Sequence, residues 1–73
     1  MSNLDKQFRI FLGRNIRALR EKKGISQEDF GKLAHVHRTY VGMVERGEKN
    51  ITLSNQVRFA QALGVKVRDL IDF

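Results

Sequence analysis

The stretch SQEDFGKLAHVHRTYVGMVERGEKN, residues 26–50, contains two short amphipathic segments separated by a turn. Ser26 and Asp29 are spaced as in a capping box, which indicates that a helix begins at this point. A second apolar pattern follows the two histidines and stops at Gly47. The apolar residues at helical spacing are Phe30, Leu33 and Ala34 in the first segment and Tyr40, Val41 and Val44 in the second. Two short helices joined by a tight turn predict a helix-turn-helix unit over about residues 27–46.

Three further features of this stretch fit such a unit. Gly31 is a small residue at the point where the second helix would cross the first, and no proline interrupts either helix. Apolar residues stand where the two helices would pack together, at Phe30, Ala34, Val36, Val41 and Val44. One residue departs from the pattern. Many helix-turn-helix units have glycine at the turn position that His35 occupies here, because φ is positive there, so we predict a mildly strained backbone at His35.

The rest of the chain also has helical periodicity, so the predicted fold class is all-α, with five helices. Three further helices are expected at residues 4–22, 53–63 and 67–71. Gly24 ends the first of them and Thr52 caps the second. Ile10 points outward from the first helix in this scheme, which makes it a candidate contact residue.

Length and composition restrict the class of protein. A chain of 73 residues is expected to form one small domain, residues 1–73, without room for a deep substrate cleft. The absence of cysteine excludes disulfides and thiolate metal sites. No apolar run approaches the roughly 20 residues that cross a bilayer, and the N-terminus does not resemble a signal peptide. We therefore expect a cytoplasmic protein that does not contact a membrane.

The chain is strongly basic, with a formal net charge of +6. Residues 1–25 hold seven basic and two acidic groups, whereas residues 26–50 hold four of each. A small basic protein favours an anionic partner, first nucleic acid and second a membrane surface. Charge alone does not distinguish a binding surface from an ordinary solvated face.

With these residues in view, the chain resembles the Cro and lambda-repressor-like (XRE) helix-turn-helix family over about residues 9–72. The run HRTYVGMVERGEKNITL resembles a narrower group, the controller proteins of restriction–modification systems. The resemblance implies a compact five-helix domain that regulates transcription by binding double-stranded DNA, with no cofactor and no small-molecule ligand. It also implies a homodimer.

The second helix of the pair holds the residues expected to contact bases. Arg38 and Thr39 point outward if Val41 and Val44 point inward. Arginine matches the acceptors of guanine, and threonine matches a base edge or a thymine methyl group. Met43 lies near the same face and is a candidate for a methyl contact, although methionine also fills gaps in cores.

A second group is expected to contact DNA phosphates. The resemblance implies this role for Gln27, at the start of the first helix of the pair, with the helix N-terminus assisting. The residue types and their positions suggest the same role at five further positions. These are His37, Tyr40, Arg46, Lys49 and Asn50. For Gln27, the alternative is a neutral surface glutamine, and the ring of Tyr40 can pack on the domain while its hydroxyl reaches a phosphate.

Glu45 would repel DNA if it faced the duplex. The resemblance implies instead that Glu45 forms a partly buried salt bridge with Arg20 of the first helix, which ties that helix to the recognition helix.

One recognition helix reads few bases, so a two-fold dimer is expected on a palindromic operator with half-sites about 34–36 Å apart. The fourth and fifth helices would supply the dimer surface. The candidate residues are Val65, Leu70, Ile71 and Phe73. Alternatively, these apolar groups close the core of the monomer.

Three other functions were weighed against DNA binding. An antitoxin-like module with a protein partner remains open. An enzyme is rejected, because no serine, tyrosine or histidine has an oriented partner and no phosphate loop is present. A metal site at His35 and His37 is disfavoured, because structural sites need four ligands and there is no third histidine.

Overall fold

The computed structural model describes residues 3–72, except for the side chains of Asn3 and Leu4. Five helices lie in this part of the chain, and they confirm the all-α prediction. They are α1 (Asn3–Lys23), α2 (Gln27–Ala34), α3 (Arg38–Glu45), α4 (Leu53–Leu63) and α5 (Val67–Leu70). The observed ends lie within one residue of the predicted ends, and α2 and α4 begin directly after the predicted caps Ser26 and Thr52.

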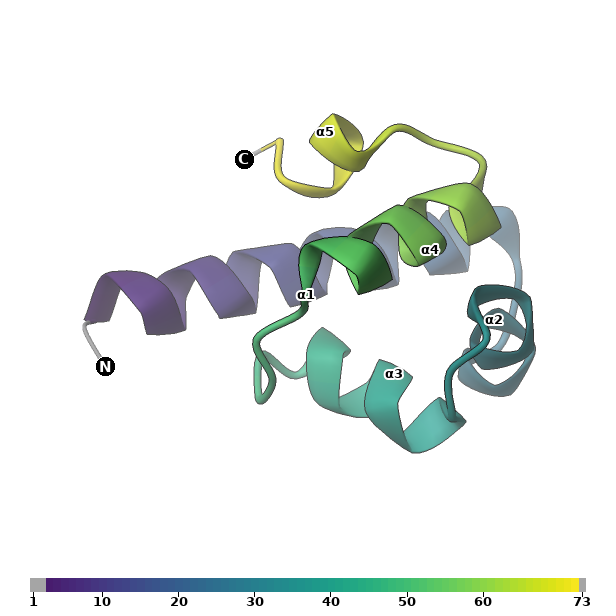
Figure 1. Ribbon diagram of the computed structural model, residues 1–73, viewed down its shortest axis with the longest axis horizontal. Coiled ribbons are helices and arrows are strands. Elements are labelled where there is room, and N and C mark those ends of the chain that lie inside the picture. Colours follow the sequence, from purple (N-terminus) through teal and green to yellow (C-terminus); the bar gives the residue numbers. More distant parts are fainter. Residues whose placement is uncertain (1–2, 73) are drawn as a thin grey trace.

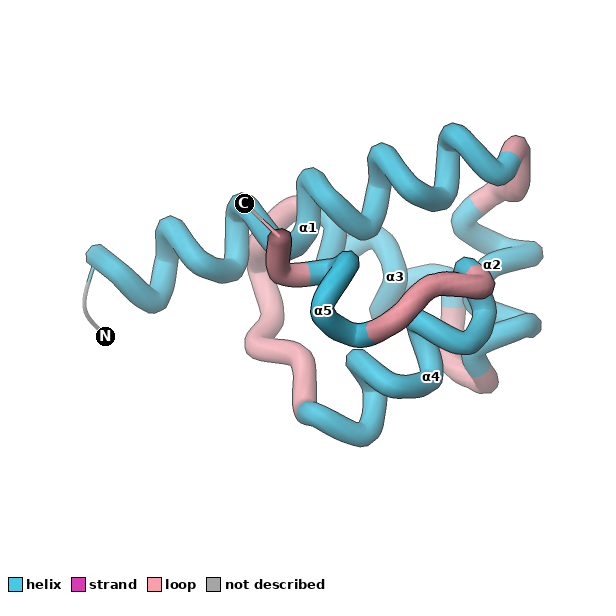
Figure 2. Tube along the Cα trace, turned by 90° about the horizontal axis from the view of Figure 1, so that it is seen from above, coloured by secondary structure: helices cyan, strands magenta, loops and turns pink. Residues whose placement is uncertain are grey.

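The long helix α1 runs along the molecule beside α4, as Figure 1 shows. The helices α2 and α3 lie on one side of this pair, and α5 lies on the other side (Figures 1 and 2). Because α3 contacts both α1 and α2, its orientation is set by the rest of the fold.

One hydrophobic core joins all five helices. Phe59 of α4 is fully buried, and its ring meets Phe30 of α2 edge to face at a centroid distance of 4.9 Å. The ring of Tyr40 meets Phe59 in the same way at 6.1 Å. The remaining core residues are Leu12, Ile16, Ala34, Val41, Val44, Ile51, Ala60, Leu63 and Leu70. The predicted inward residues of α3, Val41 and Val44, are therefore confirmed.

The turn between α2 and α3 is built on His35, which has φ 61° and ψ 39°. The N–H of Val36 donates to the carbonyl of Gly31 at 2.9 Å, which closes a Schellman-type helix end. The chain uses glycine at the corresponding positions after α1 and α4, at Gly24 and Gly64. Among residues 3–72, His35 alone is a non-glycine residue with a positive φ. The positive φ expected at His35 is therefore confirmed.

Two glycines permit close approach of helices to α3. A Cβ atom on Gly31 would lie 2.7 Å from the carbonyl oxygen of Val36, at the start of the path into α3, so the predicted role of Gly31 is confirmed. A Cβ atom on Gly13 of α1 would lie 2.3 Å from the carbonyl oxygen of Val44. The sequence pattern did not reveal this second crossing, because Gly13 lies beside the apolar arc of α1 and not within it.

Two expectations about burial need correction. Ile10 does not point freely outward but lies against Gly47, where an added Cβ atom would be 3.0 Å from the Ile10 side chain. Leu70 is fully buried in the core of the monomer, so it cannot belong to an exposed dimer surface. The alternative, that Leu70 closes the monomer core, is the observed one.

Candidate nucleic-acid interface

The N-terminus of α3 is capped by His37. The Nδ1 atom of His37 accepts a hydrogen bond of 3.0 Å from the backbone N–H of Thr39. An Nδ1 atom that accepts carries no proton, so the remaining proton lies on Nε2, which can donate to an external group. The next residues, Arg38 and Thr39, are both exposed, as predicted from the periodicity.

Arg38 does not stand alone on this face. Its Nη1 atom lies 3.5 Å from Oε2 of Glu28 on α2, and the other carboxylate oxygen of Glu28 lies 3.9 Å from Nζ of Lys32. These residues, with Val36 and His37, line a hollow of roughly 350 Å³ between the two helices. Sequence reasoning missed Glu28, because a contact across the turn leaves no spacing signal.

Met43 and Gly42 sit differently on α3. Met43 is half-buried, so its burial fits both roles predicted for it, a methyl contact with DNA and the filling of a gap in the core. Gly42 is buried, and a Cβ atom there would lie 3.0 Å from Nη1 of Arg46 and 3.7 Å from Oε1 of Gln27. Its missing side chain makes room for neighbouring side chains of the same protein.

A buried ion pair lies behind the exposed face of α3. The Nε atom of Arg20 is 2.6 Å from Oε2 of Glu45, and Nη2 of Arg20 donates to Oε1 at 3.0 Å. The side chains of Arg20 and Glu45 are only 11% and 3% exposed. The hydrogen bond to Glu45 raises the pKa of Arg20 above its ordinary value. The predicted salt bridge is confirmed.

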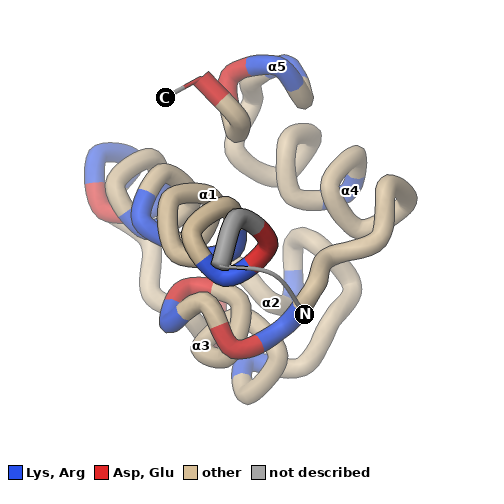
Figure 3. Tube along the Cα trace, turned by 90° about the vertical axis from the view of Figure 1, so that its left-hand side faces the viewer, with Lys and Arg blue, Asp and Glu red and all other residues tan. Residues whose placement is uncertain are grey.

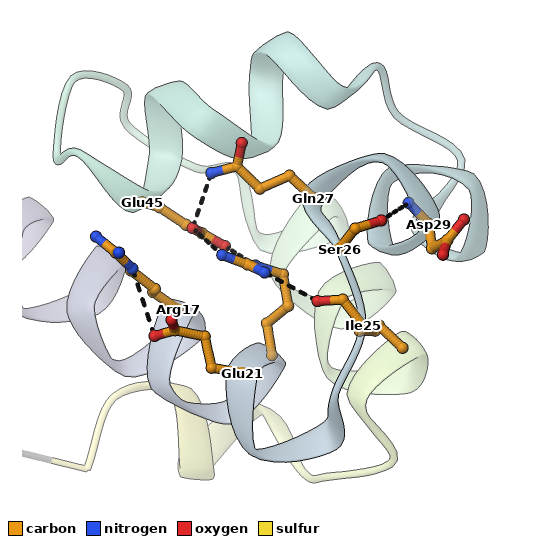
Figure 4. Close-up of polar contacts among 8 residues, drawn as sticks. Arg17, Glu21, Ile25, Ser26, Gln27, Asp29 and Glu45 are labelled. Carbon is orange, nitrogen blue, oxygen red and sulfur yellow. Dashed lines mark hydrogen bonds and ion pairs between the residues drawn. The ribbon is translucent and has the colours of Figure 1, made fainter.

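Two further contacts complete this ion-pair network. Nη1 of Arg20 donates to the carbonyl of Ile25, and Nε2 of Gln27 donates to Oε1 of Glu45 at 3.0 Å. In Figure 4 the side chain of Gln27 reaches Glu45 from α2, while Arg17 and Glu21 of α1 pair separately. Gln27 is thus held by the interior of the protein, and its amide keeps one further N–H to donate.

Tyr40 connects α3 to α4. Its hydroxyl oxygen accepts a hydrogen bond of 3.1 Å from Nδ2 of Asn55, while its ring packs on Phe59. The hydroxyl proton is not used in this bond, so it can be donated to a phosphate.

The segment after α3 carries alternating charges, as Figure 3 shows. Nε of Arg46 donates to Oε2 of Glu48 at 2.7 Å, and Nη2 donates to Oε1 at 3.3 Å. The hydrogen bond from Arg46 lowers the pKa of Glu48, and the same bond raises the pKa of Arg46. Lys49 and Asn50 follow and are exposed.

The predicted dimer residues are spread over two environments. Val65 is half-buried against the core, and Ile71 is 40% exposed. Leu70 is interior, as described above, and Phe73 lies outside the described residues.

Within residues 3–72, no helix is long and apolar enough to cross a membrane.

Comparison with known proteins agrees with this geometry. The model of a family described as helix-turn-helix matches residues 16–70. The control protein C.BamHI of Bacillus amyloliquefaciens is 37% identical over 96% of this chain and 88% of its own length. The control protein C.SmaI of Serratia marcescens is 42% identical over 82% of this chain and 71% of its own length.

A solved structure shares the fold as well. The restriction-modification controller protein C.AhdI from Aeromonas hydrophila superposes with a TM-score of 0.84 and 42% identity, covering 85% of this chain and 94% of that one. Two of these relatives are named control proteins, and the third is named a restriction-modification controller protein. The chain belongs to the XRE-like helix-turn-helix family of DNA-binding transcriptional regulators.

Proposed function

We propose that the protein binds a palindromic operator in double-stranded DNA as a homodimer, with α3 in the major groove. The observation that carries this proposal is the pair Arg38 and Thr39, exposed at the N-terminus of a helix whose other end is fixed by a buried ion pair. In helix-turn-helix proteins, the N-terminal residues of the recognition helix contact base edges. Arg38 would contact guanine and Thr39 a base edge or thymine methyl group, with Met43 as a third, apolar contact.

The phosphate contacts would surround these base contacts. His37 has a donor on Nε2, Tyr40 has a hydroxyl proton, and Gln27 has one amide N–H left over from the ion-pair network. Arg46, Lys49 and Asn50 would follow the phosphate strand beyond α3. Such contacts fix the register of the protein on DNA without reading sequence.

The homodimer requires an exposed apolar surface outside the DNA-binding face. The structure offers Leu53 and Val57 on α4, which are 69% and 39% exposed, and Ile71 after α5, which is 40% exposed. Val65 would lie at the edge of this surface. A dimer through α4 and the end of α5 would leave α3 of both copies available to the two half-sites.

The regulated genes are proposed from the relatives. Two curated relatives are named control proteins, and one solved relative is named a restriction-modification controller protein. We infer that this chain controls a restriction–modification operon in the bacterial cytoplasm.

Selection of bound sequences from random double-stranded DNA tests the proposal, with the mass of the complex measured by sedimentation. The expected result is a palindromic motif bound by two copies. Recovery of no symmetric motif would contradict the proposal and would favour an antitoxin-like role with a protein partner.

A further inference from the structure

The recognition segment is electrically neutral, although the whole chain is strongly basic. Residues 26–50 carry four basic and four acidic groups. Both arginines of the segment face a carboxylate, Arg38 at Glu28 and Arg46 at Glu48. Of these two pairs, Arg46 and Glu48 are the closer, with two hydrogen bonds of 2.7 and 3.3 Å.

The backbone places Glu48 opposite Arg46. Gly47 adopts φ 75°, and the N–H groups of Gly47 and Glu48 donate to the carbonyls of Val44 and Met43. This Schellman-type end reverses the chain directly after α3, and it brings residue 48 back toward the last turn of the helix.

Helix α1 holds this turn in place. Nε of Arg9 donates to the carbonyl of Gly47 at 3.2 Å, and Ile10 packs against the same glycine. A side chain at residue 47 would press on the Ile10 backbone, since its Cβ atom would lie 3.1 Å from the Ile10 Cα, which is tighter than an ordinary contact. The turn that carries Glu48 is therefore fixed by contacts with α1. The position of Glu48 opposite Arg46 depends on the tertiary structure and not only on the local chain.

The guanidinium of Arg46 also has a defined location. A Cβ atom on Gly42 of α3 would lie 3.0 Å from Nη1 of Arg46 and 3.7 Å from Oε1 of Gln27, so both side chains border the same glycine. A phosphate approaching Gln27 and Arg46 would meet the Glu48 carboxylate on the other edge of the same guanidinium. The negative charge of Glu48 therefore reduces the electrostatic attraction between Arg46 and a DNA phosphate.

We propose that Glu48 limits the sequence-independent affinity of this protein for DNA by pairing with Arg46. The inference rests on the proposed DNA-binding function and adds a residue that opposes it. Phosphate contacts supply most non-specific binding and compete with operator recognition, since a genome offers very many non-specific sites. A carboxylate beside a phosphate-binding arginine weakens that competition without touching a base.

The test compares the protein with its Glu48→Gln variant on two duplexes of about 30 base pairs. One carries the selected operator and the other a scrambled sequence of the same composition. Loss of the Glu48 charge should leave the Arg46 guanidinium available for a phosphate. One added phosphate contact should steepen the slope of the log binding constant against log salt concentration by about 0.9, which corresponds to about fivefold tighter binding at 0.15 M salt. The gain should be equal on both duplexes, because a phosphate contact carries no sequence information.

Two controls isolate the pair. Glu21→Gln changes the net charge by the same amount and removes the partner of Arg17 in an exposed ion pair of α1, outside the proposed DNA contacts, so it should change the affinity clearly less. In an Arg46→Ala background, Glu48→Gln should give a clearly smaller gain. Glu48→Ala repeats the test without any side chain able to pair with Arg46, and circular dichroism confirms that each variant is folded.

Unchanged or weaker binding by Glu48→Gln would overturn the inference, and so would an equal gain in the Arg46→Ala background. The proposed function fails separately, if the unaltered protein does not prefer the operator over the scrambled duplex. In that case the salt dependence on the scrambled duplex still decides the role of Glu48. Absence of binding to either duplex would contradict both proposals.

Discussion

Arg20 and Glu45 join the last turn of α1 to the last residue of α3 through a buried bidentate ion pair, with Nε and Oε2 2.6 Å apart. The third guanidinium nitrogen, Nη1, donates to the carbonyl of Ile25, and Oε1 of Glu45 accepts a second hydrogen bond from Gln27. The recognition helix is thereby fixed at its C-terminal end, away from the residues proposed to read bases. A carboxylate on a DNA-binding helix is compatible with an anionic partner because it faces the interior.

Arg20→Ala should therefore destabilise the fold. The substitution leaves the Glu45 carboxylate buried with only Gln27 as a partner, and an uncompensated buried charge costs about 3–5 kcal/mol. Chemical denaturation, followed by circular dichroism, measures the loss. The matched control is Arg17→Ala in the exposed Arg17–Glu21 pair, where the expected change is at most about 1 kcal/mol. Equal effects of the two substitutions would show that the buried pair has no special role.

Gly13→Ala should also lower stability, although alanine favours helices. The gain in helix propensity is about 1 kcal/mol. It is outweighed because the new Cβ would overlap the backbone of α3, 2.3 Å from the Val44 oxygen. We expect a net loss of about 1–3 kcal/mol from this overpacking.

Gly42→Ala is the comparison for Gly13→Ala. Its Cβ would meet the flexible end of Arg46 at 3.0 Å, which can move aside. Thermal melting should therefore show a large decrease for the first variant and little or no decrease for the second. A more stable Gly13→Ala protein would contradict the observed crossing of α1 and α3.

His35→Gly should raise stability. His35 is held at φ 61°, a conformation that disfavours a residue with a Cβ by roughly 1–2 kcal/mol. Its side chain is exposed, so glycine removes the strain without opening a cavity. Glycine also loses more backbone entropy on folding, which reduces the net gain to about 1 kcal/mol. For a chain of this size, that gain corresponds to a rise in melting temperature of about 4–8 °C. A decrease would mean that His35 makes a stabilising contact.

The contrast between Leu70 and the caps shows what the sequence could predict. The starts of α2 and α4 could be predicted because Ser26 and Thr52 bond to the backbone three residues further on. Their hydroxyl oxygens accept the expected hydrogen bonds from the backbone N–H groups of Asp29 and Asn55. Leu70 was misplaced because an apolar residue has the same sequence signature in a monomer core and in a dimer surface.

In the candidate site, too, features set by the local sequence could be predicted, whereas contacts that depend on the tertiary structure could not. Periodicity predicted the outward orientation of Arg38, and family resemblance predicted the pair of Arg20 with Glu45. The partners Glu28 and Glu48 were missed, because each ion pair depends on how the chain turns between helices. The close approach of α1 to α3 at Gly13 was missed for the same reason.

The central claim is that α3 reads bases through its N-terminal residues. Its most direct test is the affinity of the protein and of Arg38→Ala for the selected operator and for every single-base substitution in one half-site. Arg68→Ala, an exposed arginine of α5, is the control for loss of one positive charge. We predict that Arg38→Ala loses about 1–3 kcal/mol of binding free energy and loses discrimination at a guanine-containing base pair, with the other base preferences intact. A uniform loss across all the sequences, with every base preference unchanged, would contradict it.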